Sequence, residues 1–324
     1  MLMSVLLFAV GLVLLIKGGD WFVDGATGIA KRFNLPDIVV GATVVSIGTT
    51  LPEVMVSTTG ALQGSGAMAY GNAIGSIICN TALIAAISIT CNPGPVNVKS
   101  MKTPAVFFFC ASAIYCLAAY GLGTFPRWLG FIMLSVFVVY MIMTVRNGMR
   151  NPDAVSGEEE EAGKERKLWQ ELLLLVAGAA VIAVGADLLV EHGQIIALGL
   201  GVPETVVALL FVALGTSLPE LVTTITSLKK GRASLGVGNV IGANVFNLVL
   251  VSGVAVSLAP FDVPVENELL NTGLNLSLVF DIPVMLLVMS LMIFPALASK
   301  KLARWQGILL LGIYAAFCVC QFIL

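Results

Sequence analysis

Residues 44–53 read VVSIGTTLPE, and residues 211–220 read FVALGTSLPE. Each stretch places a glutamate, Glu53 or Glu220, directly after a proline in the middle of an apolar run. A charged side chain at the centre of a bilayer costs about 2.5 to 3.5 kcal/mol on insertion scales. A chain that carries this cost twice, in matching contexts, is expected to use both carboxylates.

The rest of the chain has the composition of a helical membrane protein. Of its 324 residues, 58% are hydrophobic and 11% are charged, against about 25% charged residues in soluble domains. Hydrophobic runs long enough to cross about 30 Å of hydrocarbon as helices recur from end to end. The alternating pattern of a membrane β-barrel is missing from the sequence. The predicted fold class is therefore an all-α polytopic membrane protein.

Ten transmembrane helices are predicted, and their charges indicate the orientation. They lie at about residues 2–19, 38–62, 71–91, 104–122, 126–146, 168–190, 204–228, 237–258, 276–297 and 303–323. In this arrangement all of the 17 lysines and arginines except Arg127 fall on one side of the membrane. Because positive charge marks the cytoplasmic side, we expect a multi-pass protein of the cell (inner) membrane with both termini outside.

The chain also contains an internal repeat. Adding 167 to a first-half position gives its counterpart, without a gap, over about seventy residues. Five spans in each half is an odd number, so the two halves should be inverted in the membrane, as in many transporters. We predict a first five-helix repeat at 1–146, a cytoplasmic linker at 147–167 and a second, inverted repeat at 168–324.

Polar residues around the two glutamates indicate a site for a hard cation. Pro52 and Pro219 have no N–H group, so each leaves a helical carbonyl without its donor and kinks its helix. Oxygen atoms at the same level come from Thr49, Thr50, Thr216, Ser217, Asn80, Asn247 and Ser76. A ligand set made of oxygen suits calcium or sodium. For Asn72 and Asn239, helix capping, packing and ion contact are all open.

The four spans that hold these residues contain no lysine, arginine or histidine. Two buried carboxylates without a protein cation must be protonated or balanced by bound cations. One divalent ion, two monovalent ions or two protons balance them equally, which is the physical basis of exchange. Sodium/calcium and proton/calcium antiport both fit the residues. A cation channel and a membrane-embedded hydrolase are further alternatives, although a hydrolase would need a nucleophile–base pair that the motifs do not supply.

These doubled motifs resemble the α-repeats of the cation/calcium antiporter superfamily, and most closely its sodium/calcium exchanger branch. The resemblance covers nearly the whole chain and implies a transporter, not an enzyme. It implies that Glu53 and Glu220 bind both ions, and that the first helices of the two halves slide as a pair. It also implies calcium contacts from the Thr49 and Thr216 carbonyls, sodium sites lined by Thr50, Ser217 and Ser76, and a waist formed by Asn80 and Asn247. We expect a monomer in the lipid bilayer that transports calcium and sodium, with no cofactor and no nucleic-acid partner.

Two residues depart from the family pattern. Ala243 lies opposite Ser76, where the family often has serine, so one sodium site loses a hydroxyl oxygen. Asn247 replaces an aspartate found in some members, which limits the charge of the site to −2 and argues against potassium co-transport. A calcium-loaded site is then neutral, and a site with more than two sodium ions is positive. Exchange is therefore expected to be electrogenic.

Overall fold

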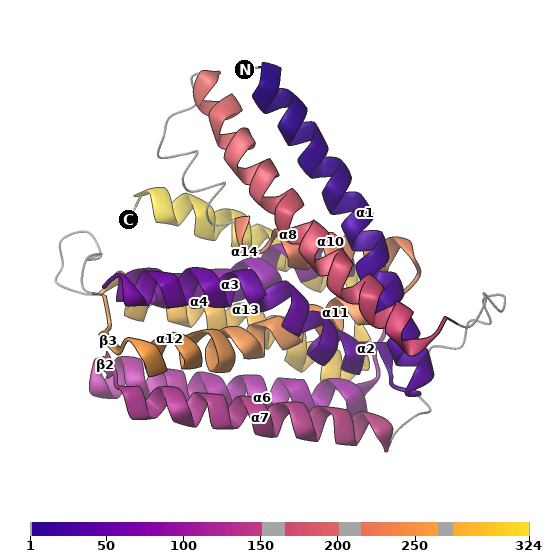
Figure 1. The fold of residues 1–324 in the computed structure, drawn as a ribbon. Helices are drawn as coiled ribbons and strands as arrows, with labels where there is room; N and C mark the ends of the chain where they lie inside the picture. The colour runs from indigo at the N-terminus through magenta and orange to yellow at the C-terminus, as the bar shows by residue number, and fades with distance from the viewer. Residues whose placement is uncertain (1, 151–165, 201–214, 265–274, 324) are drawn as a thin grey trace.

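The computed structural model describes residues 2–150, 166–200, 215–264 and 275–323, and nearly all of these residues are helical (Figure 1). The α-helices are α1 (Leu2–Arg32), α2 (Asp37–Val40), α3 (Ser46–Leu62), α4 (Gly66–Cys79), α5 (Ala86–Cys91), α6 (Val98–Cys116), α7 (Arg127–Met149), α8 (Leu168–Gly199), α10 (Leu218–Lys229), α11 (Ala233–Phe246), α12 (Ser252–Leu258), α13 (Ile282–Ser299) and α14 (Arg304–Ile323). The π-helical segments are η1 (Gly41–Val45), η2 (Asn80–Ala85), η3 (Leu117–Leu122), η5 (Asn247–Val251) and η7 (Ser277–Asp281).

Several of these segments join into long apolar helices. Within the described ranges, eight are long and apolar enough to cross a membrane: Leu2–Arg32, Asp37–Leu62, Gly66–Cys91, Val98–Leu122, Arg127–Met149, Leu168–Ile196, Ala233–Leu258 and Ser277–Ser299. The predicted all-α membrane class is therefore confirmed. Helices α10 and α14 lie in the two other predicted spans, but residues 204–214 of the span predicted at 204–228 fall outside the described residues.

Two predicted spans are shorter than the helices that contain them. The first span was expected at 2–19, yet α1 continues to Arg32. Buried residues recur along its second half at helical spacing, among them Phe22, Ala26 and Ile29, so its apolar stripe extends beyond the charges. Helix α8 likewise runs to Gly199, beyond the predicted end at 190.

Helices α1 and α8 form an antiparallel pair that is tilted steeply against the other helices (Figure 1). Their backbones approach each other at glycines. A Cβ on Gly11 would lie 2.8 Å from the carbonyl oxygen of Gly185, and a Cβ on Gly18 would lie 3.0 Å from that of Gly178. Gly178 and Gly185 are the repeat counterparts of Gly11 and Gly18. Small residues at such crossings allow close packing of membrane helices.

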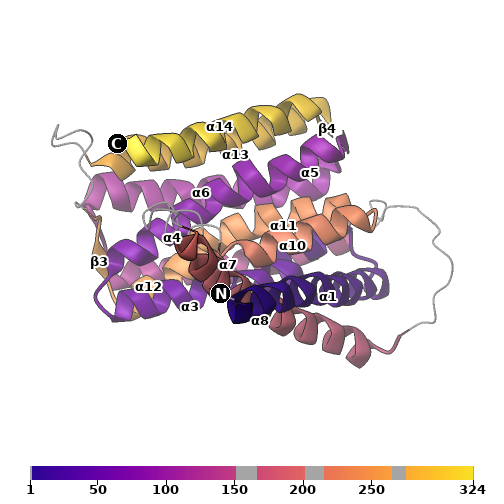
Figure 2. The same cartoon turned by 90° about the horizontal axis from the view of Figure 1, so that it is seen from above.

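Helix α11 lies at the centre of the remaining helices, which form layers when the molecule is viewed from above (Figure 2). Every residue of α11 from Leu235 to Phe246 is buried, as expected for a helix enclosed on all sides. It packs directly against η1, where a Cβ on Gly242 would lie 2.6 Å from the Cα of Ala42. The hydroxyl of Tyr140 donates to the Ala42 carbonyl at 2.7 Å, so this buried π-helical backbone is held by α7.

Short strands tie the two halves together at both ends of the molecule. Strand β1 (Gly94–Pro95) pairs with β4 (Lys301–Leu302), and β2 (Thr124–Phe125) pairs with β3 (Phe261–Asp262), both antiparallel. Each pair joins a turn of the first half to a turn of the second half.

Candidate functional site

Glu53 and Glu220 are both fully buried, with 0% of their surface exposed. None of their four carboxylate oxygens has a hydrogen-bond partner, and neither residue forms an ion pair with a described residue. The two carboxylates lie within range of mutual electrostatic repulsion. A buried charge without a partner strongly destabilises a protein. The pair therefore requires protons or bound cations.

The helices that carry the glutamates differ in form. Helix α3 continues through Pro52 without a break, whereas the chain turns at Thr216 and Ser217 before α10 begins. Pro219 lies in the first turn of α10, where a missing N–H group has no intrahelical role. Both prolines were expected to kink a helix. In the second half the helix is broken just before Pro219, whereas in the first half α3 is continuous through Pro52.

Most of the other predicted side chains are buried with unpartnered polar atoms. These are Thr50, Ser76, Asn80, Ser217 and Asn247, of which the two asparagines have neither amide atom bonded. Their elements pack on one another, α3 against η5 and α10 against η2. An unsatisfied buried polar group costs about 1 to 3 kcal/mol, and native proteins contain few of them. Such a concentration indicates a place for a polar ligand.

Hydroxyl groups of the first half face the carboxylate of the second. Thr49 and Thr50 lie next to the Glu220 carboxylate, but neither hydroxyl is hydrogen-bonded to it. Carboxylates, hydroxyls and backbone carbonyls supply oxygen atoms here, and the Cys79 thiol lies near Ser217 and Glu220. The arrangement suits a hard cation that prefers oxygen, and calcium and sodium are of this kind.

Asn80 and Asn247 each begin a π-helical segment, η2 and η5. A π-helical turn shifts the register of side chains around the helix and is frequent at functional sites. The two residues are repeat counterparts, so the same local distortion occurs twice. Nothing in the composition of these apolar spans predicted it.

Asn72 and Asn239 reach across to the opposite half. Thr49 donates its hydroxyl hydrogen to Asn239 Oδ1 at 3.1 Å, and Thr216 donates to Asn72 Oδ1 at 3.3 Å. The sequence left helix capping, packing and ion contact open for these asparagines. The structure places them as hydrogen-bond partners of the two predicted site threonines.

Sequence reasoning missed a further buried polar group beside Ala243. The Asn244 amide donates to Thr81 Oγ1 at 2.7 Å and approaches Met289 Sδ at 3.1 Å, while its Oδ1 has no partner. Isoleucine and leucine occupy the counterpart positions 77 and 248, so the repeat contained no signal for this pair. The presence of an asparagine and a threonine within otherwise apolar spans was the only feature of the sequence that could have indicated this pair.

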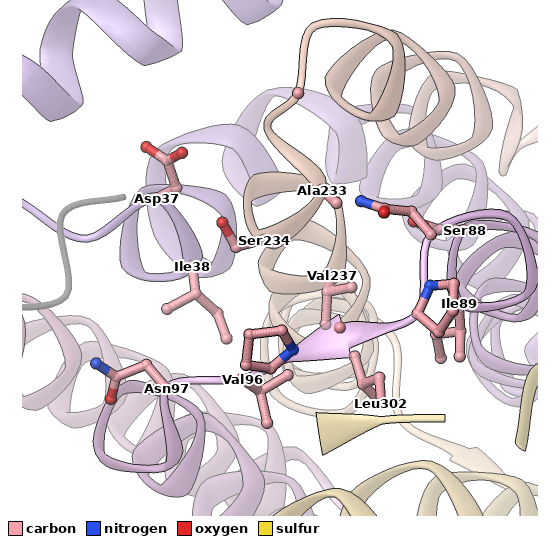
Figure 3. A pocket seen from close by; sticks show the side chains of 15 residues that line it. Asp37, Ile38, Ser88, Ile89, Val96, Asn97, Ala233, Ser234, Val237 and Leu302 are labelled. Atoms are coloured by element: carbon pink, nitrogen blue, oxygen red, sulfur yellow. The ribbon is translucent and has the colours of Figure 1, made fainter. Parts of the chain in front are cut away.

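A cavity of about 360 Å³ lies elsewhere in the described part of the chain (Figure 3). It is bordered by α2, α5, the segment 92–97, the start of α11 and Leu302. Arg232 and Asp37 form an almost fully buried ion pair at 3.2 Å at this end of the molecule. None of the nine predicted site residues lines the cavity, so it is separate from the cluster around the glutamates.

Comparison with known proteins gives a consistent result. The family model described as sodium/calcium exchanger protein matches residues 3–146 and 171–323. An uncharacterized membrane protein of Methanocaldococcus jannaschii is 34% identical over 95% of this chain and 94% of its own length. The sodium/calcium exchanger MaX1 of Methanosarcina acetivorans is 29% identical over 98% of both chains. A solved structure of the sodium-calcium exchanger NCX_Mj superposes with a TM-score of 0.77 at 31% identity, covering 97% of each chain.

Proposed function

Because this chain belongs to the sodium/calcium exchanger protein family, we propose that it is a secondary antiporter that moves calcium out of the cell in exchange for sodium. It works by alternating access, so that one site opens to one side of the membrane at a time. Glu53 and Glu220 bind both ions in turn. Bound calcium neutralises the two carboxylates while the site turns from the inside to the outside. Bound sodium balances them while the site returns.

The remaining ligands surround this pair. Thr49 and Thr216 offer their carbonyls to calcium and their hydroxyls to sodium. Thr50, Ser217 and Ser76 line the sodium sites, and Asn80 and Asn247 form the waist between them. Potassium has no dedicated carboxylate at position 247, so it is not co-transported.

One observation supports this proposal above the others. Four carboxylate oxygens and a group of hydroxyl and amide atoms are buried together without any partner. A structural glutamate in a membrane would bond to a neighbouring helix, because unsatisfied groups are costly in hydrocarbon. Atoms kept free in this way are available to a transported ion.

The proposed architecture comprises ten spans arranged as two inverted repeats, 1–146 and 168–324, joined by a cytoplasmic linker at 147–167. The contacts between counterpart glycines of the antiparallel helices α1 and α8 support this symmetry. The distribution of lysine and arginine supports both termini outside, in the cell (inner) membrane. A monomer is sufficient, since both halves of the site come from one chain.

The test is calcium uptake into vesicles that contain the purified protein. An imposed sodium gradient should drive uptake, and Glu53→Gln or Glu220→Gln should reduce it to the level of empty vesicles because each removes one of the two charges. Glu191→Gln is the matched control, since Glu191 is an exposed glutamate of α8. Calcium transport by either site variant at the rate of this control would refute the site assignment.

The same vesicles distinguish the rival coupling ion. The two unpaired glutamates could carry protons instead of sodium, which would make the protein a proton/calcium antiporter. In that case a pH gradient, and not a sodium gradient, would drive calcium uptake. A channel would instead show flux that neither saturates nor responds to calcium on the opposite side.

A further inference from the structure

The crosswise bonds of Asn72 and Asn239 have a defined direction. The Asn72 amide nitrogen donates to Ser57 Oγ at 2.8 Å and approaches the Glu53 carbonyl oxygen at 3.4 Å. A carbonyl oxygen can only accept, so the nitrogen must be on that side. The Oδ1 atom of Asn72 therefore faces Thr216, and the Thr216 hydroxyl must donate its hydrogen to it.

Asn239 repeats this arrangement with one difference. Its Oδ1 accepts from Thr49 at 3.1 Å. Ser46 Oγ lies 3.3 Å from the same atom, but its single hydrogen has closer acceptors in the carbonyls of Gly41 and Asn239, at 2.9 and 3.0 Å. The Asn239 Nδ2 atom has no partner. In the Asn239 side chain, only the oxygen therefore takes part in a hydrogen bond.

The direction of the hydroxyl hydrogen decides whether a threonine can hold a cation. A hydroxyl has one hydrogen and two lone pairs, and it can point a lone pair at a cation only when its hydrogen points elsewhere. The Thr49 hydroxyl also lies next to the Glu220 carboxylate. Without Asn239, its hydrogen would turn to that carboxylate and occupy one of the oxygens that an ion needs.

We propose that Asn72 and Asn239 are positioning residues that direct the hydroxyl hydrogens of Thr216 and Thr49 away from the ion site, each across to the opposite repeat, and thereby set the affinity for sodium. This inference rests on the proposed sodium/calcium exchange. Calcium binding depends on the carboxylates and the threonine carbonyls, and the two asparagine side chains do not orient these groups. Sodium binding depends on the threonine hydroxyls, so the asparagines affect mainly the affinity for sodium.

The first measurement compares two substitutions at one position. Asn239→Leu removes the acceptor with little change in volume, and the sodium concentration for half-maximal calcium efflux should rise about tenfold, the loss of one oriented hydrogen bond. Asn239→Asp keeps the acceptor and loses only the unused nitrogen, so it should not raise that concentration. Calcium self-exchange without sodium should change less than about threefold in Asn239→Leu, which also shows that this variant folds.

The second measurement tests the crosswise pairing by double-mutant cycles. In a Thr49→Val background, Asn239→Leu should change the half-maximal sodium concentration by less than about twofold, because the hydroxyl on which it acts is gone. In a Thr216→Val background it should keep its full effect. Asn72→Leu should show the reverse pattern, and it carries the test if Asn239→Leu does not fold.

The outcomes separate this inference from the function on which it rests. If the unmodified protein shows no sodium-driven calcium flux, both are overturned. If it does, and Asn239→Leu and Asn72→Leu keep the unmodified sodium dependence, only the positioning role is overturned. Equal coupling of each asparagine to both threonines, or equal losses for sodium and calcium, would indicate a general packing role and would also overturn it.

Discussion

Ser76 and Ala243 occupy counterpart positions of the repeat and differ by one oxygen atom. Ser76 Oγ is buried and unpartnered, whereas Ala243 presents only a methyl group at a fully buried position. The neighbouring Asn244 donates its amide hydrogen to Thr81 and keeps an unpartnered Oδ1. At the counterpart positions themselves, the second half has one oxygen fewer than the first.

Restoring this oxygen should strengthen sodium binding. We expect Ala243→Ser to lower the sodium concentration for half-maximal calcium efflux by about threefold to tenfold, the value of one added polar contact. Ala243→Cys is the matched control, because it has nearly the size of serine but offers a soft sulfur that sodium does not favour. The measurement is sodium-driven efflux from vesicles. An equal response of the serine and cysteine variants would show that the gain comes from volume and not from the oxygen.

At the level of helices, α11 connects the site to the rest of the fold. It carries Asn239 and packs Gly238 against α2 and Gly242 against η1, so its backbone approaches that of the first repeat directly. This contact holds Asn239 beside Thr49. The packing and the hydrogen bond therefore depend on the same separation between helices.

A methyl group at this contact should be destabilising. A Cβ at position 242 would collide with Ser46 Oγ and lie 2.6 Å from Ala42 Cα, so Gly242→Ala should lower the free energy of unfolding by about 1 to 3 kcal/mol. Gly312→Ala in α14 is the control, because nothing lies within 4 Å of its Cβ. That variant should be neutral or stabilised by up to about 1 kcal/mol. Thermal unfolding in detergent measures both, and equal midpoints would contradict the predicted clash.

At the scale of the whole molecule, the proposed transport cycle depends on the charge of the candidate site. Two carboxylates give −2, with no described cationic side chain paired to them. A calcium-loaded site is neutral, and a site holding three sodium ions carries one positive charge. The membrane potential acts only on the charged form, at about 2.3 kcal/mol per charge for 100 mV.

Sodium-driven calcium efflux should therefore depend on voltage. For one net charge per cycle, an inside-negative potential of about 100 mV should change the steady-state calcium gradient at a fixed sodium gradient by about 50-fold. The potential can be set in vesicles with potassium and valinomycin. Calcium self-exchange is the internal control and should not respond, because its loaded site is neutral. A calcium gradient that is unchanged by voltage would mean electroneutral exchange.

Much of this protein follows from local features of its chain. Apolar runs require helices in a membrane, because hydrocarbon offers no partner for exposed backbone groups, and the all-α class is confirmed. The offset of 167 identifies the paired glutamates and the polar residue types that accompany them in each half. The predicted first span ends before Asp20, whereas in the fold Lys230 lies 3.6 Å from the Asp20 carboxylate and α1 continues to Arg32.

Other features arise only when distant segments meet. The bonds from Thr49 to Asn239 and from Thr216 to Asn72 link residues that are 190 and 144 positions apart, and no periodicity encodes such partners. The π-helical turns at Asn80 and Asn247 and the polar pair of Asn244 and Thr81 are likewise set by packing between helices. The chain therefore specifies which oxygens are present, and the packing of the two halves specifies which of them are left without a partner and which are hydrogen-bonded across the repeats.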